Sequence, residues 1–350
     1  MKKIALSLFF SLTVLISFAQ KEGKKYNVRT LAFYNLENLF DTINNPNKND
    51  EASPIMGLKT NKSKVYWDKI DKLGSVISQI GFDKAKTGPA VIGVCEIENK
   101  AVLEDLVKSK HLKKMNYEII HYESPDKRGI DVALLYQKKY FNPVNHQSFT
   151  PNIYKDGFRV YTRDQLLVSG YLDDELIHVI VNHWPSRRGG EAKSSPLREK
   201  AAYQNVKIVE KLREENKKAK IFIMGDFNDN PTNASLKKVL KTKGKKKKVK
   251  KRSIYNPYEK LFKEGNGTLT YRDNIYLFDQ IMISSSVLDK GKKDYSTYKM
   301  FKAKIFNKRF LTEKKGKFKG YPFRSFSYGK YTGGYSDHYP VYLYLIKEKK

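Results

Sequence analysis

Residues 225 to 231 carry polar side chains directly after an apolar run, and their types suit phosphate chemistry. The segment has the sequence GDFNDNP and follows the run IFIM at residues 221 to 224. Asp226 and Asn228 flank Phe227, so in an extended chain both side chains would point the same way. Carboxylate and amide oxygens are ligands that Mg²⁺ or Mn²⁺ accepts. The same residue types are typical of turns, so this segment alone indicates either a site or an Asx-rich turn.

Other apolar runs in the chain also end in residues that bind metals or transfer protons. Taken alone, Glu96 would be explained as a surface charge and His183 as a satisfied histidine at a strand edge. Because such residues recur at so many expected strand ends, we expect them to converge on one site. The residues are Asn35, Glu37, Glu96, His183, Asp226, Asn228, Asp279, Asp337 and His338.

Arginines accompany two of these strand ends, and guanidinium groups suit the binding of phosphate. Arg128 lies at the start of an expected strand, whereas Arg187 and Arg188 follow Asn182 and His183 within a few residues. Arg128, Arg187 and Asn182 are therefore candidates for binding a phosphate group.

Short apolar runs indicate the strands that would position these residues, and apolar residues at helical spacing indicate the helices. Nothing in their order indicates a domain boundary, so we expect one α/β domain over residues 27–347. Pro196 is expected to open the third helix, because proline suits the first helical position. We expect strands over 28–34, 90–94, 117–122, 130–136, 166–172, 176–182, 221–224, 278–283 and 341–346, helices over 64–80, 100–109 and from 196 onward, and loops over 41–61 and 243–252.

The first 19 residues have the parts of a secretory signal, with Lys2 and Lys3 before an apolar run and Ser17-Phe18-Ala19 at its end. The alternative is an uncleaved anchor, but the run is shorter than the ~20 residues that span a bilayer. We therefore expect a signal peptide over 1–19, a short tail over 20–26, and an exported protein in the periplasm or outside the cell. No later segment indicates stable membrane association or an obligate protein partner.

The formal net charge of the chain is +31, and loss of Lys2 and Lys3 with the signal would leave +29. So large a positive charge predicts polyanionic partners, although surface lysines such as those at 245–248 also serve solubility alone. Residues 286–332 mix lysine with tyrosine and phenylalanine, which suits either stacking on bases or an aromatic-rich surface. The lone Cys95 excludes an intrachain disulfide and a cysteine-based zinc site, and it is expected to be a core residue.

Seven motifs in this chain resemble those of the endonuclease/exonuclease/phosphatase superfamily, to which deoxyribonuclease I belongs. GDFNDNP and SDHYPV are the specific ones, and all seven occur in the family's order over almost the whole expected domain. The resemblance implies an exported, bacterial-type member with a four-layer α/β sandwich, in which helices flank two packed mixed β-sheets. The motifs are YNLEN at 34–38, CEIEN at 95–99, RGIDVALLY at 128–136, NHWPSR at 182–187, GDFNDNP at 225–231, FDQI at 278–281 and SDHYPV at 336–341.

The resemblance also implies hydrolysis of a phosphoester with Mg²⁺ or Mn²⁺, with Ca²⁺ as an alternative. It implies that His338 is the general acid or base and that Asp279 orients it. His183 matches a second, phosphate-binding histidine, and Arg128 and Arg187 are looser matches. The implied metal ligands are Glu96, Asn35, Glu37 and Asp337, and the implied positioning residues for water and phosphoryl oxygens are Asp226 and Asn228.

The resemblance specifies the reaction better than the substrate. The positive charge and the expected export favour a nuclease that acts on DNA or RNA. A phosphodiesterase or phosphatase for lipid headgroups or small phosphorylated molecules stays open, because the shared motifs do not encode the leaving group. An inactive module that binds polyanions is the third alternative, and the intact set of acids, amides and histidines argues against it.

Overall fold

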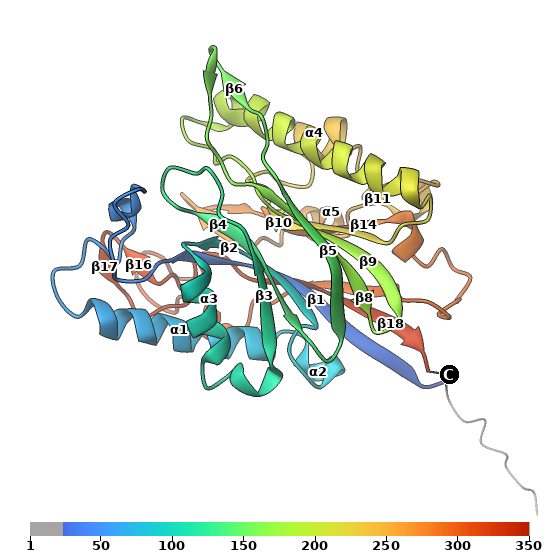
Figure 1. The fold of residues 1–350 in the computed structure, drawn as a ribbon, viewed down its shortest axis with the longest axis horizontal. Coiled ribbons are helices and arrows are strands. Elements are labelled where there is room, and N and C mark those ends of the chain that lie inside the picture. Colours follow the sequence, from blue (N-terminus) through green and yellow to red (C-terminus); the bar gives the residue numbers. More distant parts are fainter. Residues whose placement is uncertain (1–23, 350) are drawn as a thin grey trace, which may run out of the picture.

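Two six-stranded β-sheets form the centre of the protein, for which the computed structural model describes residues 24–349. Helices cover the outer face of each sheet, so the predicted four-layer sandwich is confirmed (Figure 1). The first sheet has the order β15 (Lys299–Ile305), β18 (Val341–Glu348), β1 (Tyr26–Leu39), β2 (Val91–Ile97), β4 (Asp131–Gln137) and β3 (Tyr117–His121). The second has the order β11 (Ile254–Tyr255), β14 (Asp279–Ser284), β10 (Ile221–Asp226), β9 (Glu175–His183), β8 (Gln165–Leu172) and β5 (Phe141–Phe149).

Both sheets are mixed, because each contains one parallel pair beside antiparallel neighbours. Strand β1 runs parallel to β2, and β9 runs parallel to β10. The helices are α1 (Lys62–Gln79), α2 (Phe82–Ala85), α3 (Lys100–Lys108), α4 (Glu191–Glu215) and α5 (Tyr258–Lys263). Three small hairpins complete the fold: β6 (Tyr154–Lys155) with β7 (Phe158–Arg159), β12 (Leu269–Tyr271) with β13 (Asn274–Tyr276), and β16 (Phe326–Ser327) with β17 (Lys330–Tyr331).

Three hydrophobic layers hold these elements together, and the alternation along the strands explains why. In β1, Leu31 and Phe33 face the other sheet, whereas Ala32 and Tyr34 face the layer that contains α1 and α3. Successive side chains of a strand point to opposite faces, so a strand buried on both sides is apolar throughout, as the expected strands were. The third layer lies between the second sheet and α4.

The structure differs from the sequence-based expectations at several elements. Strands β5 and β15 were not predicted, and both lie at sheet edges where much of the surface is exposed and polar. The prediction that Pro196 opens a helix was wrong, because α4 begins at Glu191, after Gly190, whose φ of 104° is positive. The main chain of Ser194 already donates to Gly190 within this first turn, so Pro196 lies inside the helix. In a helix of 25 residues the hydrogen bond that proline removes is tolerated.

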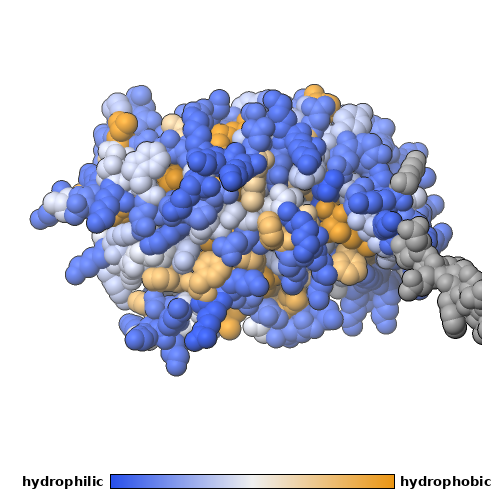
Figure 2. All heavy atoms as spheres, turned by 90° about the horizontal axis from the view of Figure 1, so that it is seen from below, coloured by the Kyte–Doolittle hydropathy of each residue, from blue (hydrophilic) through white to orange (hydrophobic). Residues whose placement is uncertain are grey.

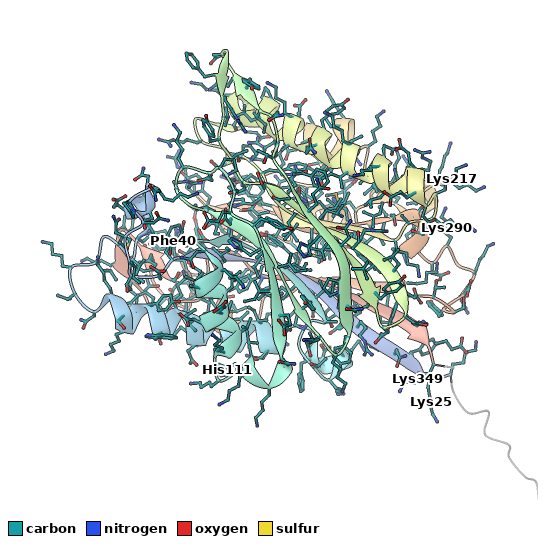
Figure 3. All side chains as sticks on the ribbon, in the orientation of Figure 1. Lys25, Phe40, His111, Lys217, Lys290 and Lys349 are labelled. Atoms are coloured by element: carbon teal, nitrogen blue, oxygen red, sulfur yellow. The ribbon has the colours of Figure 1, made fainter. Side chains whose placement is uncertain are left out.

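Both ends of the described chain lie at one end of the first sheet. The main chain of Lys349 donates to the carbonyl of Lys25 at 2.8 Å, and the two residues lie side by side in Figure 3. Phe40, which follows β1, lies at the opposite end of that strand (Figure 3). Asn35 and Glu37 belong to this second end, so the candidate site lies far from the termini.

The surface seen from below is mostly hydrophilic, with hydrophobic residues in separate areas (Figure 2). Within residues 24–349, none of the helices has the length and hydrophobicity needed to span a bilayer. The expected signal peptide at residues 1–19 lies outside the described residues, as does most of the expected tail at 20–26. The expected basic loop at 243–252 contains one short 3₁₀ turn, Lys246–Lys248.

Candidate active site

The ends of five strands bring the predicted residues of both sheets together. In the second sheet Asp226 of β10 pairs with His183 of β9 on one side and with Asp279 of β14 on the other. In the first sheet Asn35 of β1 pairs with Cys95, next to Glu96. The strand ends of the two packed sheets therefore carry their polar residues to a common region.

Two clusters of candidate ligands form there, and Asp226 belongs to both. Ligand atoms of Glu96, His183 and Asp226 lie within 4.8 Å of one another, and so do those of Asp226, Asp279 and His338. Of these five side chains, only Glu96 is more than slightly exposed. The structure thus joins residues from four strands and the loop before β18 into one continuous group.

His338 and Asp279 form a close pair within this group. The distance from His338 Nδ1 to Asp279 Oδ2 is 2.6 Å, and both side chains are buried. Burial alone would lower the pKa of His338, but the charge of Asp279 and its hydrogen bond raise that pKa well above the usual value. Because Nδ1 faces Asp279, Nε2 is the nitrogen left to exchange a proton with a substrate or water.

Asp226 lies between the two histidines and is itself fully buried. Burial raises its pKa, His338 lowers it, and the nearby charge of Asp279 raises it again. One oxygen, Oδ1, accepts the main-chain N–H of Asn228 at 2.9 Å, and the other, Oδ2, accepts the Asn35 amide at 3.2 Å. A carboxylate held in this way is well placed to orient a ligand without moving.

Glu96 projects into the site because β2 is irregular at this residue. The pairing of β2 with β4 shifts between Cys95 and Ile97, so Glu96 is the extra residue of a bulge, with φ at 58°. Bulges next to active sites often redirect a side chain in this manner. The Glu96 carboxylate accepts the Asn35 amide at 3.0 Å and the main-chain N–H of Asn38 at 3.0 Å.

His183 faces both carboxylates of its cluster. Its Nε2 lies 3.8 Å from Glu96 Oε1 and 3.7 Å from Asp226 Oδ2. Burial lowers the pKa of His183 well below the usual value, and the charges of Arg163 and Arg128 lower it further. The buried Nδ1 has no hydrogen-bond partner among residues 24–349. A neutral imidazole with a free nitrogen is able to bind a metal ion or to donate to a phosphate oxygen.

The donor set of the Glu96 cluster fits a divalent cation. Two carboxylates supply hard oxygen ligands, which suit Mg²⁺ and Mn²⁺, and the imidazole of His183 adds a nitrogen that Mn²⁺ accepts more readily than Mg²⁺. The Asn35 side chain lies beside these ligands. Its Nδ2 donates to Glu96 and Asp226, and its Oδ1 accepts the main-chain N–H of Glu37.

Asn228, Asn182 and Glu37 lie in the site differently from the expectation. Asn228 is not in an extended segment beside Asp226, because it has φ at 49°, and its amide donates to the Trp184 carbonyl at 3.1 Å. The side chain of Asn182 faces away from the site, since it neighbours His183 in the same strand and points to the other face. It is fully buried, where Trp184 and Asn205 of α4 donate to its Oδ1.

Glu37 is the third, and it does not join either cluster of ligands. Strand β1 is irregular between Asn35 and Leu39, and Glu37 has φ at 48°, which turns its carboxylate toward the loop before β16. There it accepts the N–H of Ser325 at 2.6 Å and that of Phe326 at 3.4 Å. The buried Lys69 of α1 donates to Ser325 Oγ at 2.6 Å and to the Glu37 carbonyl. Glu37 thus anchors the loop that carries Arg324.

Arg324 was missed by the sequence analysis, because it lies in the aromatic and basic stretch 286–332 that showed no motif. Its Nη2 lies 3.1 Å from Asp337 Oδ2, and its Nε lies 3.4 Å from Glu37 Oε1. Asp337 is therefore paired with a guanidinium and, like Glu37, belongs to neither cluster of ligands. Arg324, Asp337 and His338 line one cavity of about 740 Å³ together with Arg187 and Arg188.

Arg163 and Asp126 were also missed, and they connect the Arg128 turn to the site. Arg163 Nη1 lies 3.2 Å from Asp126 Oδ2, and both groups are buried. The same arginine donates to the carbonyls of His183 and Trp184, while Asp126 accepts the main-chain N–H of Arg128 at 3.0 Å. A buried arginine just before a strand gives no sequence signal of this role.

The two predicted phosphate-binding arginines have different surroundings. Arg128 is partly exposed and close enough to lower the pKa of His183, so its guanidinium is available for a ligand. Arg187 donates to the Asn228 carbonyl at 2.8 Å and to Asp229 at 3.2 Å, and it stacks over Phe278 at 4.7 Å. Its first role is therefore to hold the loop after β10, at the edge of the cavity.

A family model described as Endonuclease/Exonuclease/phosphatase family matches residues 30–347. The chain belongs to this family. The resemblance that the motifs GDFNDNP and SDHYPV indicated is confirmed, and with it the fold of a phosphoester hydrolase. No curated protein matches the chain significantly.

Solved structures of the same fold cover nearly the whole chain. TDP2 of D. rerio in complex with a single-strand DNA product is 14% identical, with a TM-score of 0.53 over 91% of this chain and 98% of that one. A family protein from Bacteroides thetaiotaomicron is 18% identical, with a TM-score of 0.54 over 93% of this chain and 100% of that one. A mannosyl-6-phosphatase from the same species is 17% identical, with a TM-score of 0.52 over 91% and 99%. At these identities the likeness shows the fold alone.

Proposed function

We propose that this protein is a divalent-metal-dependent phosphoester hydrolase that acts on nucleic acid. The observation that carries the proposal is the buried His338–Asp279 pair, 2.6 Å apart, beside the cluster of Glu96, His183 and Asp226. A proton donor held by a carboxylate next to a set of hard ligands is a combination suited to the hydrolysis of a phosphoester by water.

Glu96, Asp226 and His183 would hold the cation, which when bound offsets the negative charge that develops on the phosphoryl oxygens. His338, whose raised pKa keeps the imidazole protonated, donates its Nε2 proton to the leaving oxygen as the bond between that oxygen and phosphorus breaks. On the opposite side the attacking water forms the new phosphorus–oxygen bond and gives up a proton to Asp226, whose pKa burial raises to about 7. Asp279 keeps the imidazole in one tautomer and stabilises its protonated form. Asp226 orients the water, and Arg128 and Arg324 add positive charge at the phosphate.

Nucleic acid is the preferred substrate class because the chain is strongly basic and because arginines line the cavity that contains His338. The formal net charge is +31, and Arg187, Arg188 and Arg324 line the cavity that contains His338. A structural neighbour, TDP2 of D. rerio, binds a single-strand DNA product. We further propose export of the protein, which the composition of residues 1–19 supports. Cell fractionation with N-terminal sequencing tests this, and a protein found only in the cytoplasm with Met1 intact would contradict it.

The test of the reaction is an incubation of the purified protein with different phosphoesters. Plasmid DNA, a single-stranded oligonucleotide, RNA, sphingomyelin and inositol phosphates are each incubated with Mg²⁺, with Mn²⁺ or with EDTA. We expect cleavage of nucleic acid with either metal and none in EDTA, and cleavage about 10²- to 10⁴-fold slower by His338→Ala. Full hydrolysis in excess EDTA would refute the metal dependence.

A phosphatase for small phosphorylated molecules is the second candidate. The cavity beside His338, at about 740 Å³, has the size of a pocket for one small molecule. The mannosyl-6-phosphatase among the structural neighbours shows that this fold supports such a reaction. Turnover of a sugar phosphate without cleavage of DNA or RNA would favour this alternative.

A further inference from the structure

Two cavities lie on either side of a ridge next to His338. The first is the one of about 740 Å³ that contains His338, and the second, of about 840 Å³, extends away from it. Each alone falls in the range of about 300 to 1,000 Å³ that serves one small molecule. Together they offer room for a ligand longer than one nucleotide. The ridge residues that line both are Thr270, Tyr271, Arg272, Tyr321, Pro322 and Arg324.

The tips of two small hairpins, β12–β13 and β16–β17, border the second cavity. In β16–β17, Ser327 pairs with Lys330, which leaves Tyr328 and Gly329 as a two-residue turn with φ at 49° and 73°. Such turns favour asparagine or glycine at both positions, because other residues are strained at positive φ. A tyrosine in this position gains nothing from burial, since Tyr328 is 82% exposed. The strain therefore points to a contact made by the ring with something outside the chain.

The other hairpin repeats this feature. Tyr271 pairs with Asn274, so that Arg272 and Asp273 form the turn, with φ at 47° and 60°. Tyr271 is 57% exposed, and the Arg272 guanidinium lies over its ring at 5.3 Å. An exposed aromatic ring and a cation are again presented together at the edge of the same cavity.

Hydrogen bonds hold Tyr321, which begins a row of aromatic rings, in place before any ligand binds. Tyr321 Oη donates to Asp273 Oδ1 at 2.5 Å and accepts the main-chain N–H of Asp273 at 2.8 Å. Phe318 lies between Tyr321 and Tyr328, with ring centroids 5.5 Å and 6.3 Å away. The row of rings is thus held at its Tyr321 end, which lowers the entropy that this end loses when a ligand stacks on the row.

Two cations of the second cavity make no ion pair among residues 24–349. These are Arg272 and Lys317, whereas Arg324 is paired with Glu37 and Asp337, and the acidic residues that line the cavity are Glu37, Asp273 and Glu313. Asp273 is bonded to Tyr321, and Glu313 accepts the main-chain N–H of Lys314. Cations that alternate with exposed aromatic rings are the arrangement that binds unpaired bases and their phosphates.

We propose that the second cavity binds the nucleotides next to the scissile phosphate of a single-stranded nucleic acid, whose unpaired bases stack on Tyr328 and Tyr271. The assignment rests on the proposed function, and it makes the protein selective for unpaired strands. In a duplex the faces of the bases are already stacked on one another, so these rings would have nothing to bind.

The experiment compares binding and cleavage for ring variants of the full chain. Tyr328→Asn is the main variant, because asparagine fits the left-handed turn and so leaves the hairpin folded. Tyr328→Phe keeps the ring, and Tyr203→Ala, which removes another 57% exposed tyrosine on α4, is the matched control. The probes are a labelled oligothymidylate of about 12 nucleotides, a duplex of the same length and a chromogenic small phosphodiester.

We expect Tyr328→Asn and Tyr271→Ala each to weaken single-strand binding by about 5- to 150-fold. In Tyr328→Asn, whose ring does not line the cavity that contains His338, duplex binding and turnover of the small phosphodiester should not change, and Tyr328→Phe should behave as the wild type. Equal losses for single strand and duplex, or no loss at all, would overturn the inference while cleavage by the wild type still supports the proposed function. Should the wild type neither bind nor cleave any nucleic acid yet hydrolyse the small phosphodiester, the proposed function fails and this inference with it.

Discussion

The pairing of His338 with Asp279 gives the sharpest prediction for turnover. The two residues are 59 positions apart in sequence, yet Nδ1 and Oδ2 are 2.6 Å apart and no solvent separates two such buried groups. Removal of a general acid or base costs about 10²- to 10⁴-fold in rate, or about 3 to 5.5 kcal/mol in the barrier. His338→Ala should lose this amount. Asp279→Asn should lose a similar amount, because the imidazole then lacks the charge that stabilises its protonated form.

The double variant decides whether the two residues act together. Residues that act as a unit are strongly non-additive, so His338→Ala with Asp279→Asn should be about as slow as His338→Ala alone. Independent action would instead multiply the losses to about 10⁴- to 10⁸-fold. Single-turnover rates on a chromogenic phosphodiester measure this difference, and multiplied losses would refute the pairing.

A second buried pair in the same chain serves as the control for folding. His121 Nε2 lies 2.9 Å from Asp131 Oδ2, and both side chains are about as buried as those of the first pair. His121 lies on β3, and neither residue belongs to the candidate ligand clusters. His121→Ala should therefore lower the melting temperature without lowering the rate per folded molecule. A comparable loss of rate in this variant would show that the effect of His338→Ala is structural.

Three further predictions concern the metal, the arginine network and pH. Glu96→Gln should abolish the rise in melting temperature on addition of Mn²⁺, which binding to the native state alone produces, and a rise equal to that of the wild type would exclude Glu96 as a ligand. Arg163→Met leaves Asp126 buried and unpaired and should destabilise the protein by about 3 to 5 kcal/mol in urea unfolding, whereas the exposed Lys218→Met should change little. Burial lowers the pKa of His178, so the native state keeps this histidine neutral while the unfolded state takes up a proton below about pH 6.5. The stability of the protein should therefore fall as the pH decreases from 7 toward the lowered pKa. His178 Nδ1 lies 2.7 Å from Ser169 Oγ, and His178→Asn keeps a hydrogen-bonding group for Ser169 but cannot titrate, so this variant should reduce the fall. A melting temperature with the same pH dependence in the variant and the wild type would contradict this.

The sequence predicted the parts of the site that depend on strand ends. Asp226 and His183 end apolar runs and Asp279 begins one. The structure places Asp226 and Asp279 in one cluster with His338, and Asp226 and His183 in another with Glu96. The alternation of side chains along a strand could not decide which of Asn182 and His183 faces the site, because both follow the same apolar run. Only the register of β9 with its neighbouring strands places one of them in the site. The arginines Arg163 and Arg324 have long-range partners, which a local pattern does not contain.

The backbone distortions around the site explain the remaining errors. Glu37, Asn38, Glu96 and Asn228 all have positive φ without being glycine, and they lie at the strand ends that meet here. Residues in such conformations cost of order 1 to 3 kcal/mol each and persist only where the surroundings determine them. A sequence does not distinguish a glutamate in a bulge from a glutamate in a regular strand, so the directions in which the Glu37 and Glu96 side chains point could not be predicted. The strain lies in the segments that hold the carboxylates, and the three hydrophobic layers behind them supply the stability that keeps those segments in place.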